Sequence, residues 1–102
     1  MTENEVLETL VTAIRERRLV QFKIDGRLIT ALPCAVGALP SGQRAAWIYQ
    51  RSRRQKRPTG DEWRLIELSH IASAVPSPFG REPIPLEWEW PANVFQTIYA
   101  RL

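Results

Sequence analysis

The sequence predicts a mainly β fold with flanking helices, built on a small five-stranded SH3-like or Sm-like barrel. Three observations predict it: an apolar pattern of helical period near the N-terminus, short runs of period two after it, and turn residues between those runs. The chain has 102 residues, 44% hydrophobic and 25% charged, as is typical of one soluble globular domain. We expect a single domain, 1–102, divided into an N-terminal helix (1–18), the barrel (19–76), and a proline-rich segment with a C-terminal helix (77–102).

The first predicted element is a helix over residues 4–18. Its apolar residues recur at helical spacing, at Val6, Leu7, Leu10, Val11 and Ile14. Asn4 can cap this helix, or Thr2 and Glu5 can form a capping box. Arg15, Arg17 and Arg18 follow at its end, where the helix dipole explains the positive charge without a ligand; contact with a polyanion is the other explanation.

From Leu19 the apolar period changes to two, as on a half-buried strand, with Val20, Phe22 and Ile24 on one face. Asp25-Gly26 follows and is typical of a tight hairpin. A longer second strand is expected over Arg27–Ala38, with an edge, bulge or bend at Pro33, because proline cannot donate to a β-ladder. Pro40–Gln43 reads as the next turn.

The stretch from Arg44 to Ile71 organises the chain. Two strand-like runs, Ala45–Gln50 and Trp63–Leu68, flank a basic loop. Residues 51–57 of this loop contain no acidic residue and five basic ones: Arg51, Arg53, Arg54, Lys56 and Arg57. Trp47 and Tyr49 precede the loop and Trp63 follows it. The residues alone leave open which face of the 45–50 strand is buried, so these rings are either exposed beside the arginines or packed in the core.

The net charge of +3 comes from this loop, since the rest of the chain has more acidic than basic residues. Cations beside flat rings suit a polyanion or a charged planar ligand. The alternative is a solvated hairpin tip that arginine keeps soluble.

The C-terminal third is predicted to contain a short helical turn at Ser69–Ile71 and a fifth strand at Ala72–Pro76. Residues 76–91 hold five of the eight prolines, so we expect an extended segment there. A final helix is expected over roughly 92–101, because Pro91 suits a first turn and the apolar residues fit a stripe at Val94, Phe95, Ile98, Tyr99 and Leu102. That stripe faces either the core or a second copy of the chain.

Several motifs together resemble the WYL domain family over about Val6 to Phe79. AIRERRLVQFKIDGR is similar to the family's opening helix and hairpin, and Leu32-Pro33 with Gly37 is similar to its P-x-x-x-G stretch. Trp47-Ile48-Tyr49 falls at the naming triplet, with isoleucine in place of the middle ring. Trp63-Arg64-Leu65 with Ser69-His70-Ile71 resembles the ending motif, where His70 replaces the usual basic residue. Gln50, Ser52 and Gly60 resemble the small stand-alone members.

The resemblance implies a domain that senses nucleic acid or a nucleotide-like ligand. Members of the family are usually parts of bacterial transcription regulators, joined to a winged helix-turn-helix. No such helix pair fits outside the expected barrel, so we do not expect a complete regulator of that kind. The alternative is a protein–protein interaction or scaffold module that uses the basic loop and the C-terminal helix, either on an acidic partner protein or in a homodimer.

Other function classes find little support in the sequence. One cysteine and one histidine cannot form a structural zinc site, and no P-loop or dinucleotide glycine pattern is present. Cys34 and His70 are a conceivable nucleophile and base, but nothing near Cys34 activates it, so a buried inert thiol is the preferred interpretation. We expect no enzyme activity and no cofactor. The acidic N-terminus lacks a signal peptide and no apolar run approaches the ~20 residues of a membrane span, so we expect a cytoplasmic protein.

The sharpest expectation concerns Arg64. It should share a strand face with Ile66 and Leu68, where a guanidinium is costly unless it is paired. We therefore expect Arg64 to line a ligand pocket with His70, Gln50 and Ser52, and to hold a phosphate or carboxylate bidentately.

Overall fold

The computed structural model describes residues 1–50, 63–81 and 94–102. The chain is mainly β, with a helix at its N-terminus and an antiparallel sheet, as predicted. The elements follow one another as α1 (Glu3–Glu16), β1 (Arg18–Ile24), β2 (Arg27–Ala38), β3 (Arg44–Tyr49), β4 (Trp63–Glu67), the 3-10 turn η1 (Leu68–His70), β5 (Ile71–Arg81) and β6 (Thr97–Arg101). None of the helices in these ranges is long and apolar enough to cross a membrane.

The capping box at the start of α1 is confirmed. The Glu5 backbone N–H donates to Thr2 Oγ1 at 3.2 Å, and the Thr2 N–H donates to Glu5 Oε1 at 3.0 Å. Asn4 has another role, because its Oδ1 accepts a hydrogen bond from Arg44 Nη1 at 2.6 Å and so ties the helix to β3. The helix ends at Arg17, whose φ of 54° is left-handed and turns the chain into β1.

The long strand β2 is the centre of the sheet. Its first half pairs with β1 through a hairpin at Asp25-Gly26, and both turn residues have positive φ. Its second half pairs with β3 on one edge and with β6 on the other. The register of β2 against β3 shifts between Pro33 and Ala35, which is the irregularity that proline predicts. The full strand order is β4-β3-β2-β1-β5, with β6 added to β2.

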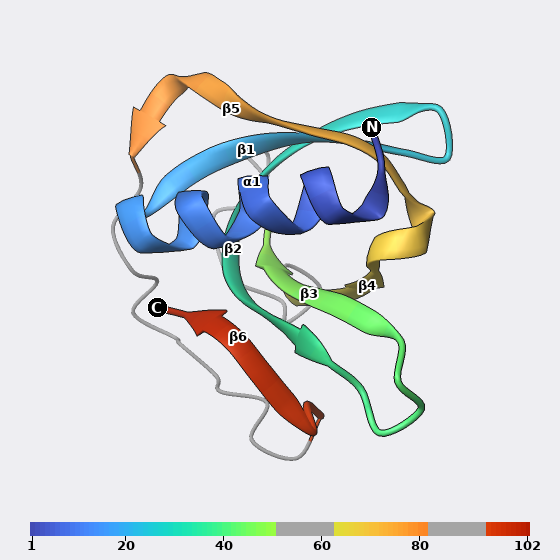
Figure 1. Cartoon of the computed structure of the whole chain (residues 1–102). Helices are drawn as coiled ribbons and strands as arrows, with labels where there is room; N and C mark the ends of the chain where they lie inside the picture. Colours follow the sequence, from blue (N-terminus) through green and yellow to red (C-terminus); the bar gives the residue numbers. More distant parts are fainter. Residues whose placement is uncertain (51–62, 82–93) are drawn as a thin grey trace.

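The helix α1 lies across the curved sheet, with β1 and β5 along one side of it and β3 and β6 along the other (Figure 1). Its buried face, Val6, Leu10, Ala13 and Ile14, packs on the inner face of the sheet. The main core contains these four residues together with Val20, Phe22, Ile24, Ala31, Val36, Ala46, Ile48, Ile66, Leu68, Ile71 and Ala74. A second apolar cluster, Ala35, Ala45 and Phe95, is packed against Leu39, Trp47 and Val94.

The predicted C-terminal helix over 92–101 is wrong. Residues Thr97–Arg101 form β6, which pairs antiparallel with β2 from Ala35 to Ala38. A lone helix of about ten residues is marginal in water, whereas the extended segment gains backbone pairing along the edge of β2. The fifth strand is also longer than predicted, since β5 continues to Arg81 and includes the start of the expected extended segment, whose residues 82–91 lie outside the described ranges.

Closure into a barrel stays a prediction. The described residues contain no backbone pairing between β4 and β5, the two ends of the sheet path.

Candidate functional site

The structure decides which face of β3 is buried. Ala46 and Ile48 belong to the main core, and strand alternation therefore places Trp47 and Tyr49 on the opposite, outer face. Tyr49 pairs with Trp63 across the β3–β4 ladder, and Trp47 pairs with Leu65. The outer face of this hairpin thus gathers three rings, Trp47, Tyr49 and Trp63, called here the aromatic cluster.

Trp63 lies at the centre of the aromatic cluster. Its ring is nearly parallel to that of Trp47, with centroids 5.7 Å apart and an interplanar angle of 12°. Its contact with Tyr49 is tilted, with centroids 4.8 Å apart at 54°. Directly opposed and diagonal residues on one sheet face come within reach of aromatic side chains, which explains both contacts. Such ring pairs contribute about 0.5–1.5 kcal/mol each beyond burial, so the hairpin holds the rings in fixed positions.

All three rings are half-buried, so each keeps part of its surface accessible within the described structure. Accessible aromatic surface is a place where a planar group can stack. The strand β3 ends at Tyr49, Gln50 follows it, and the next described residue is Trp63 at the start of β4. The sequence between these two points contains Arg51, Ser52, Arg53, Arg54, Lys56 and Arg57, all of which lie outside the described ranges. In the sequence, the basic stretch therefore lies between two members of the aromatic cluster, Tyr49 and Trp63.

Arg64 shares its strand face with Ile66, as predicted, because its ladder partner is the core residue Ile48. Its side chain is nevertheless exposed. Arg64 lies at the rim of the sheet, where its guanidinium stays in contact with water and needs no partner to offset burial. No carboxylate of the described residues forms an ion pair with Arg64, and the ion pairs there involve Arg18 and Arg44.

The other predicted site residues divide into two places. Gln50 is half-buried and directly follows Tyr49, just beyond the end of β3. His70 is exposed at the end of η1, and β4 separates it from Trp63 along the chain. Arg64 lies on the opposite face of β4 from the aromatic cluster. A cavity of about 260 Å³ lies elsewhere, between α1 and the β1–β5 side, and is lined by Glu8, Thr9, Thr12, Ala13, Glu16, Arg18 and Pro76.

Cys34 is fully buried, and its thiol contacts the Leu32 carbonyl oxygen at 3.4 Å. Burial raises the pKa of the Cys34 thiol to about 12, against a smaller lowering by the hydrogen bond of the Tyr49 backbone. The thiol is therefore protonated at neutral pH and lacks the thiolate character of a nucleophile. Within the described ranges, no three His, Cys, Asp or Glu side chains gather as metal ligands would.

Leu65 is a surface feature that the sequence did not single out. It is 41% exposed and lies opposite Trp47, so it extends the outer face of the hairpin with an apolar side chain. Its place follows from the hairpin register: once Tyr49 is paired with Trp63, Leu65 must oppose Trp47.

Comparisons with protein-family models, with curated proteins and with solved structures gave no match. The function is therefore inferred from the site itself.

Proposed function

We propose that this chain is a non-enzymatic binding module that senses nucleic acid, or a nucleotide-like anionic ligand, at the aromatic cluster and the adjoining basic residues. One observation carries the proposal: Trp47, Tyr49 and Trp63 lie together, half-exposed, on the face away from the main core.

The chemistry of the two parts is complementary. Stacking of a base on an aromatic side chain contributes about 1–3 kcal/mol and tolerates any base, because every base has a π-face. The five basic residues between Tyr49 and Trp63 supply positive charge for phosphates, with no acid among residues 51–57. Arginine in particular matches the geometry of a phosphate with its planar fork. Rings and cations joined to the same hairpin thus suit the two halves of a nucleotide.

The resemblance to the WYL domain family supports the same ligand class. We include in the proposal that residues 1–102 are one small stand-alone WYL-like domain with a closed SH3-like or Sm-like barrel. Its role would be ligand sensing in bacterial transcription regulation, in the cytoplasm. The order of the described elements, a helix, a meander and a 3-10 turn before β5, is compatible with this assignment.

Titration of the protein with a single-stranded oligonucleotide, followed by tryptophan fluorescence, tests the proposal. Binding should quench the emission and weaken with salt. If all five basic residues contact phosphates, the log–log salt slope should be about −3.5, from roughly −0.7 per contact. Replacement of the five by glutamine should remove that slope, and Trp63→Ala should weaken binding at every salt concentration. A flat salt response, or no binding at low salt, contradicts the proposal.

The alternative function is an interaction or scaffold module for an acidic partner, and it was based on the basic loop and on an apolar C-terminal helix. The second of these observations no longer holds. The apolar C-terminal helix on which self-association was expected is the strand β6, although Ile98 and Tyr99 on it are 41% and 42% exposed. Polyglutamate separates the alternatives, because it offers negative charge without bases. If polyglutamate of matched charge binds as tightly as the oligonucleotide, the scaffold function is favoured. Sedimentation at several concentrations tests the homodimer.

A further inference from the structure

We propose that three arginines where α1 ends and β1 begins, Arg15, Arg17 and Arg18, form a patch that binds the phosphates of a nucleic acid, separate from the aromatic cluster. The inference takes its ligand class from the proposed function and adds a second contact surface to it. The helix dipole explains positive charge in the last turn of α1, at Arg15. It does not explain two features of Arg17 and Arg18, each of which opposes folding.

The first feature is the backbone conformation of Arg17. Its φ of 54° and ψ of 44° are left-handed, at the point where α1 ends. A Cβ atom disfavours this conformation, and glycine is the usual residue there. Among the described residues, only Arg17 and Asp25 combine a positive φ with a side chain. Aspartate tolerates the left-handed region because its short polar side chain forms local hydrogen bonds, an explanation that does not extend to arginine.

The second feature is the position of Arg18 in the β1–β5 ladder. Arg18 is the first residue of β1, and the register places it opposite Arg81, the last residue of β5. Like charges directly opposite one another destabilise a strand pair. A neutral residue at position 18 would avoid this cost. Two consecutive positions, 17 and 18, thus carry an arginine where another residue would suit the fold better.

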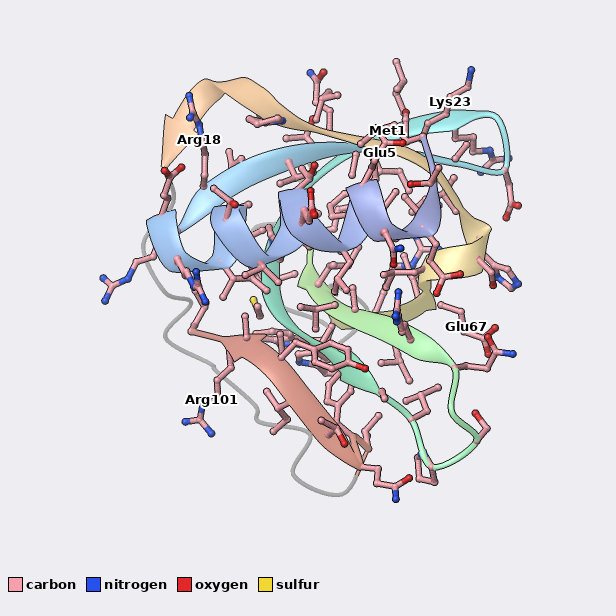
Figure 2. The ribbon with its side chains drawn as sticks, viewed as in Figure 1. Met1, Glu5, Arg18, Lys23, Glu67 and Arg101 are labelled. Atoms are coloured by element: carbon pink, nitrogen blue, oxygen red, sulfur yellow. The ribbon has the colours of Figure 1, made fainter. Side chains whose placement is uncertain are left out.

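Residues that cost stability are typical of functional surfaces, where the side chain serves a ligand. Arg15 and Arg17 are exposed and form no ion pair with a described carboxylate. Arg18 lies 3.8 Å from Glu16, but both side chains are nearly half exposed, and such a pair contributes little in water. Figure 2 shows Arg18 extending from the start of β1 beside the end of β5. A bound anion would offset the repulsion and would employ guanidinium groups that the fold itself does not use.

The surroundings of the patch favour the phosphate backbone of a strand over a small anion. The nearby cavity that Arg18 lines also contains the carboxylates of Glu8 and Glu16, which repel an anion. The ligand therefore lies on the open surface. Residues 13–20 contain no aromatic side chain, so bases have no ring to stack on there. Arginine contacts of this kind hold phosphates and position a strand without reading its sequence.

The patch and the aromatic cluster lie on opposite sides of the sheet. The helix α1 packs on the inner face, whereas Trp47 and its neighbouring rings lie on the outer face. Sites that share no partner contribute independently to a free energy. The losses of binding from one change at each site should therefore add in the double variant Arg17→Gly, Trp63→Ala.

Arg17→Gly is the central test, because a structural role and a binding role predict opposite effects on stability. Loss of the Cβ atom at a left-handed residue should raise the melting temperature by a few degrees. The same change should weaken binding of an oligothymidylate longer than about 16 nucleotides, the upper end of the site sizes of small single-strand-binding domains. It should lower the log–log salt slope by about 0.7, the value of one phosphate contact on a single strand. Arg17→Lys keeps the charge and should keep that slope.

Arg18→Gln is a second, independent variant. It removes the like-charge pair, so it should also raise the melting temperature while it weakens binding. Asp25→Gly is the control for the backbone effect, since it removes the other side chain at a positive φ. Arg27→Ala is the control for charge, because Arg27 is exposed at the start of β2. The patch is refuted if Arg17→Gly and Arg18→Gln bind with the affinity and salt slope of Arg27→Ala, or if both melt well below the wild type.

The failure of the patch is distinguishable from that of the proposed function. A loss of oligonucleotide binding with Trp63→Ala but not with Arg17→Gly overturns the patch alone. The reverse result overturns the aromatic site and leaves the patch, and no binding by the wild type overturns both. Polyglutamate of matched charge tests the partner class. An equal loss of polyglutamate binding in Arg17→Gly overturns the nucleic-acid assignment in favour of an acidic protein.

Discussion

Gly37 of β2 lies directly against the carbonyl oxygen of Thr97 in β6. A Cβ atom at position 37 would collide with that oxygen and would lie 3.1 Å from both Ile98 Cα and Phe95 Cδ1. Two backbones meet so closely here that only glycine fits, which is one of the few reasons for glycine inside a strand. This contact seats the last strand on the sheet.

Gly37→Ala should destabilise the protein and loosen β6. Two of the three atoms that the new methyl group meets belong to the backbone, so no side-chain rotation relieves the collision. Overpacking of this kind costs about 1–3 kcal/mol. Urea unfolding followed by circular dichroism measures the loss. Gly42→Ala is the comparison, because position 42 has open space around it and only its φ of 89° opposes a side chain. Equal stability of the Gly37 variant and the wild type would show that β6 is not seated in this way.

The capping box of α1 should make stability depend on acid pH. The hydrogen bonds from Thr2 hold the pKa of Glu5 below its ordinary value of 4.5. A carboxyl with a lowered folded-state pKa adds stability above its unfolded pKa, and this stability is lost as the pH falls through the folded value. The melting temperature of Glu5→Gln should therefore fall less than that of the wild type between neutral pH and pH values below 4.5. Parallel curves for the two proteins would refute the prediction.

Thr2→Ala should remove the other half of the capping box. Loss of an N-cap side chain costs about 0.5–2 kcal/mol of stability, and helix content should fall in the first turn. Hydrogen exchange of the Glu5 amide reports the change directly, because that N–H donates to Thr2 Oγ1. Thr9→Ala is a suitable control within α1, away from the cap. Unchanged exchange at Glu5 would show that the cap is not formed in solution.

Cys34 should react with thiol reagents only when the protein opens. The thiol is buried, and burial raises its pKa to about 12 from an ordinary value of 9.0. Labelling at pH 8 should be slow in the native protein and fast in urea. The same shift predicts alkaline destabilisation: the folded state retains the proton while the unfolded state loses it, so stability falls as the pH rises from about 9 to about 12. Cys34→Ala should lack this part of the pH dependence, and native labelling as fast as in urea would contradict the burial.

Arg64→Lys should leave both folding and oligonucleotide binding unchanged. The side chain is exposed and forms no ion pair with a described carboxylate, so the fold does not depend on its guanidinium. Arg64 also lies on the face of β4 opposite the aromatic cluster, because its ladder partner is the core residue Ile48. Oligonucleotide titration of the two proteins, with matched unfolding curves, measures the difference. Weaker binding by the lysine variant, which keeps the charge but loses the planar fork, would bring Arg64 into the binding site.

The local elements of this fold were readable from the sequence because their signals are local. The capping box, the Asp25-Gly26 hairpin and the irregularity at Pro33 each depend on residues close in the chain, and each is confirmed. The register of β3 against β4 was not predicted, because knowing which face is buried still allows shifts of two residues. The buried face of β3 was not predictable either, because Ala45 and Ala46 are both buried, one in each apolar cluster.

The strand β6 was missed because its partner is remote. Its apolar residues fit a helical stripe, and only the open edge of β2 makes the extended form preferable. Thr97, Ile98 and Tyr99 are residues that favour strands, and Gly37 is a position that invites a second backbone. These signals point to a strand only when they are considered together.

The pairing of β6 with β2 also sets an order of events for a chain under synthesis. The edge of β2 beyond Ala31 is made early, but its partner is not made until residues 97–101 have been added. Until then the nascent chain presents an unpaired strand edge, the kind of surface that templates aggregation. Contacts between such distant segments also slow folding, because a large loop must close first. A ribosome that stalls before residue 97 therefore leaves a product whose central strand is half-partnered, and chaperone demand should rise with every such pause.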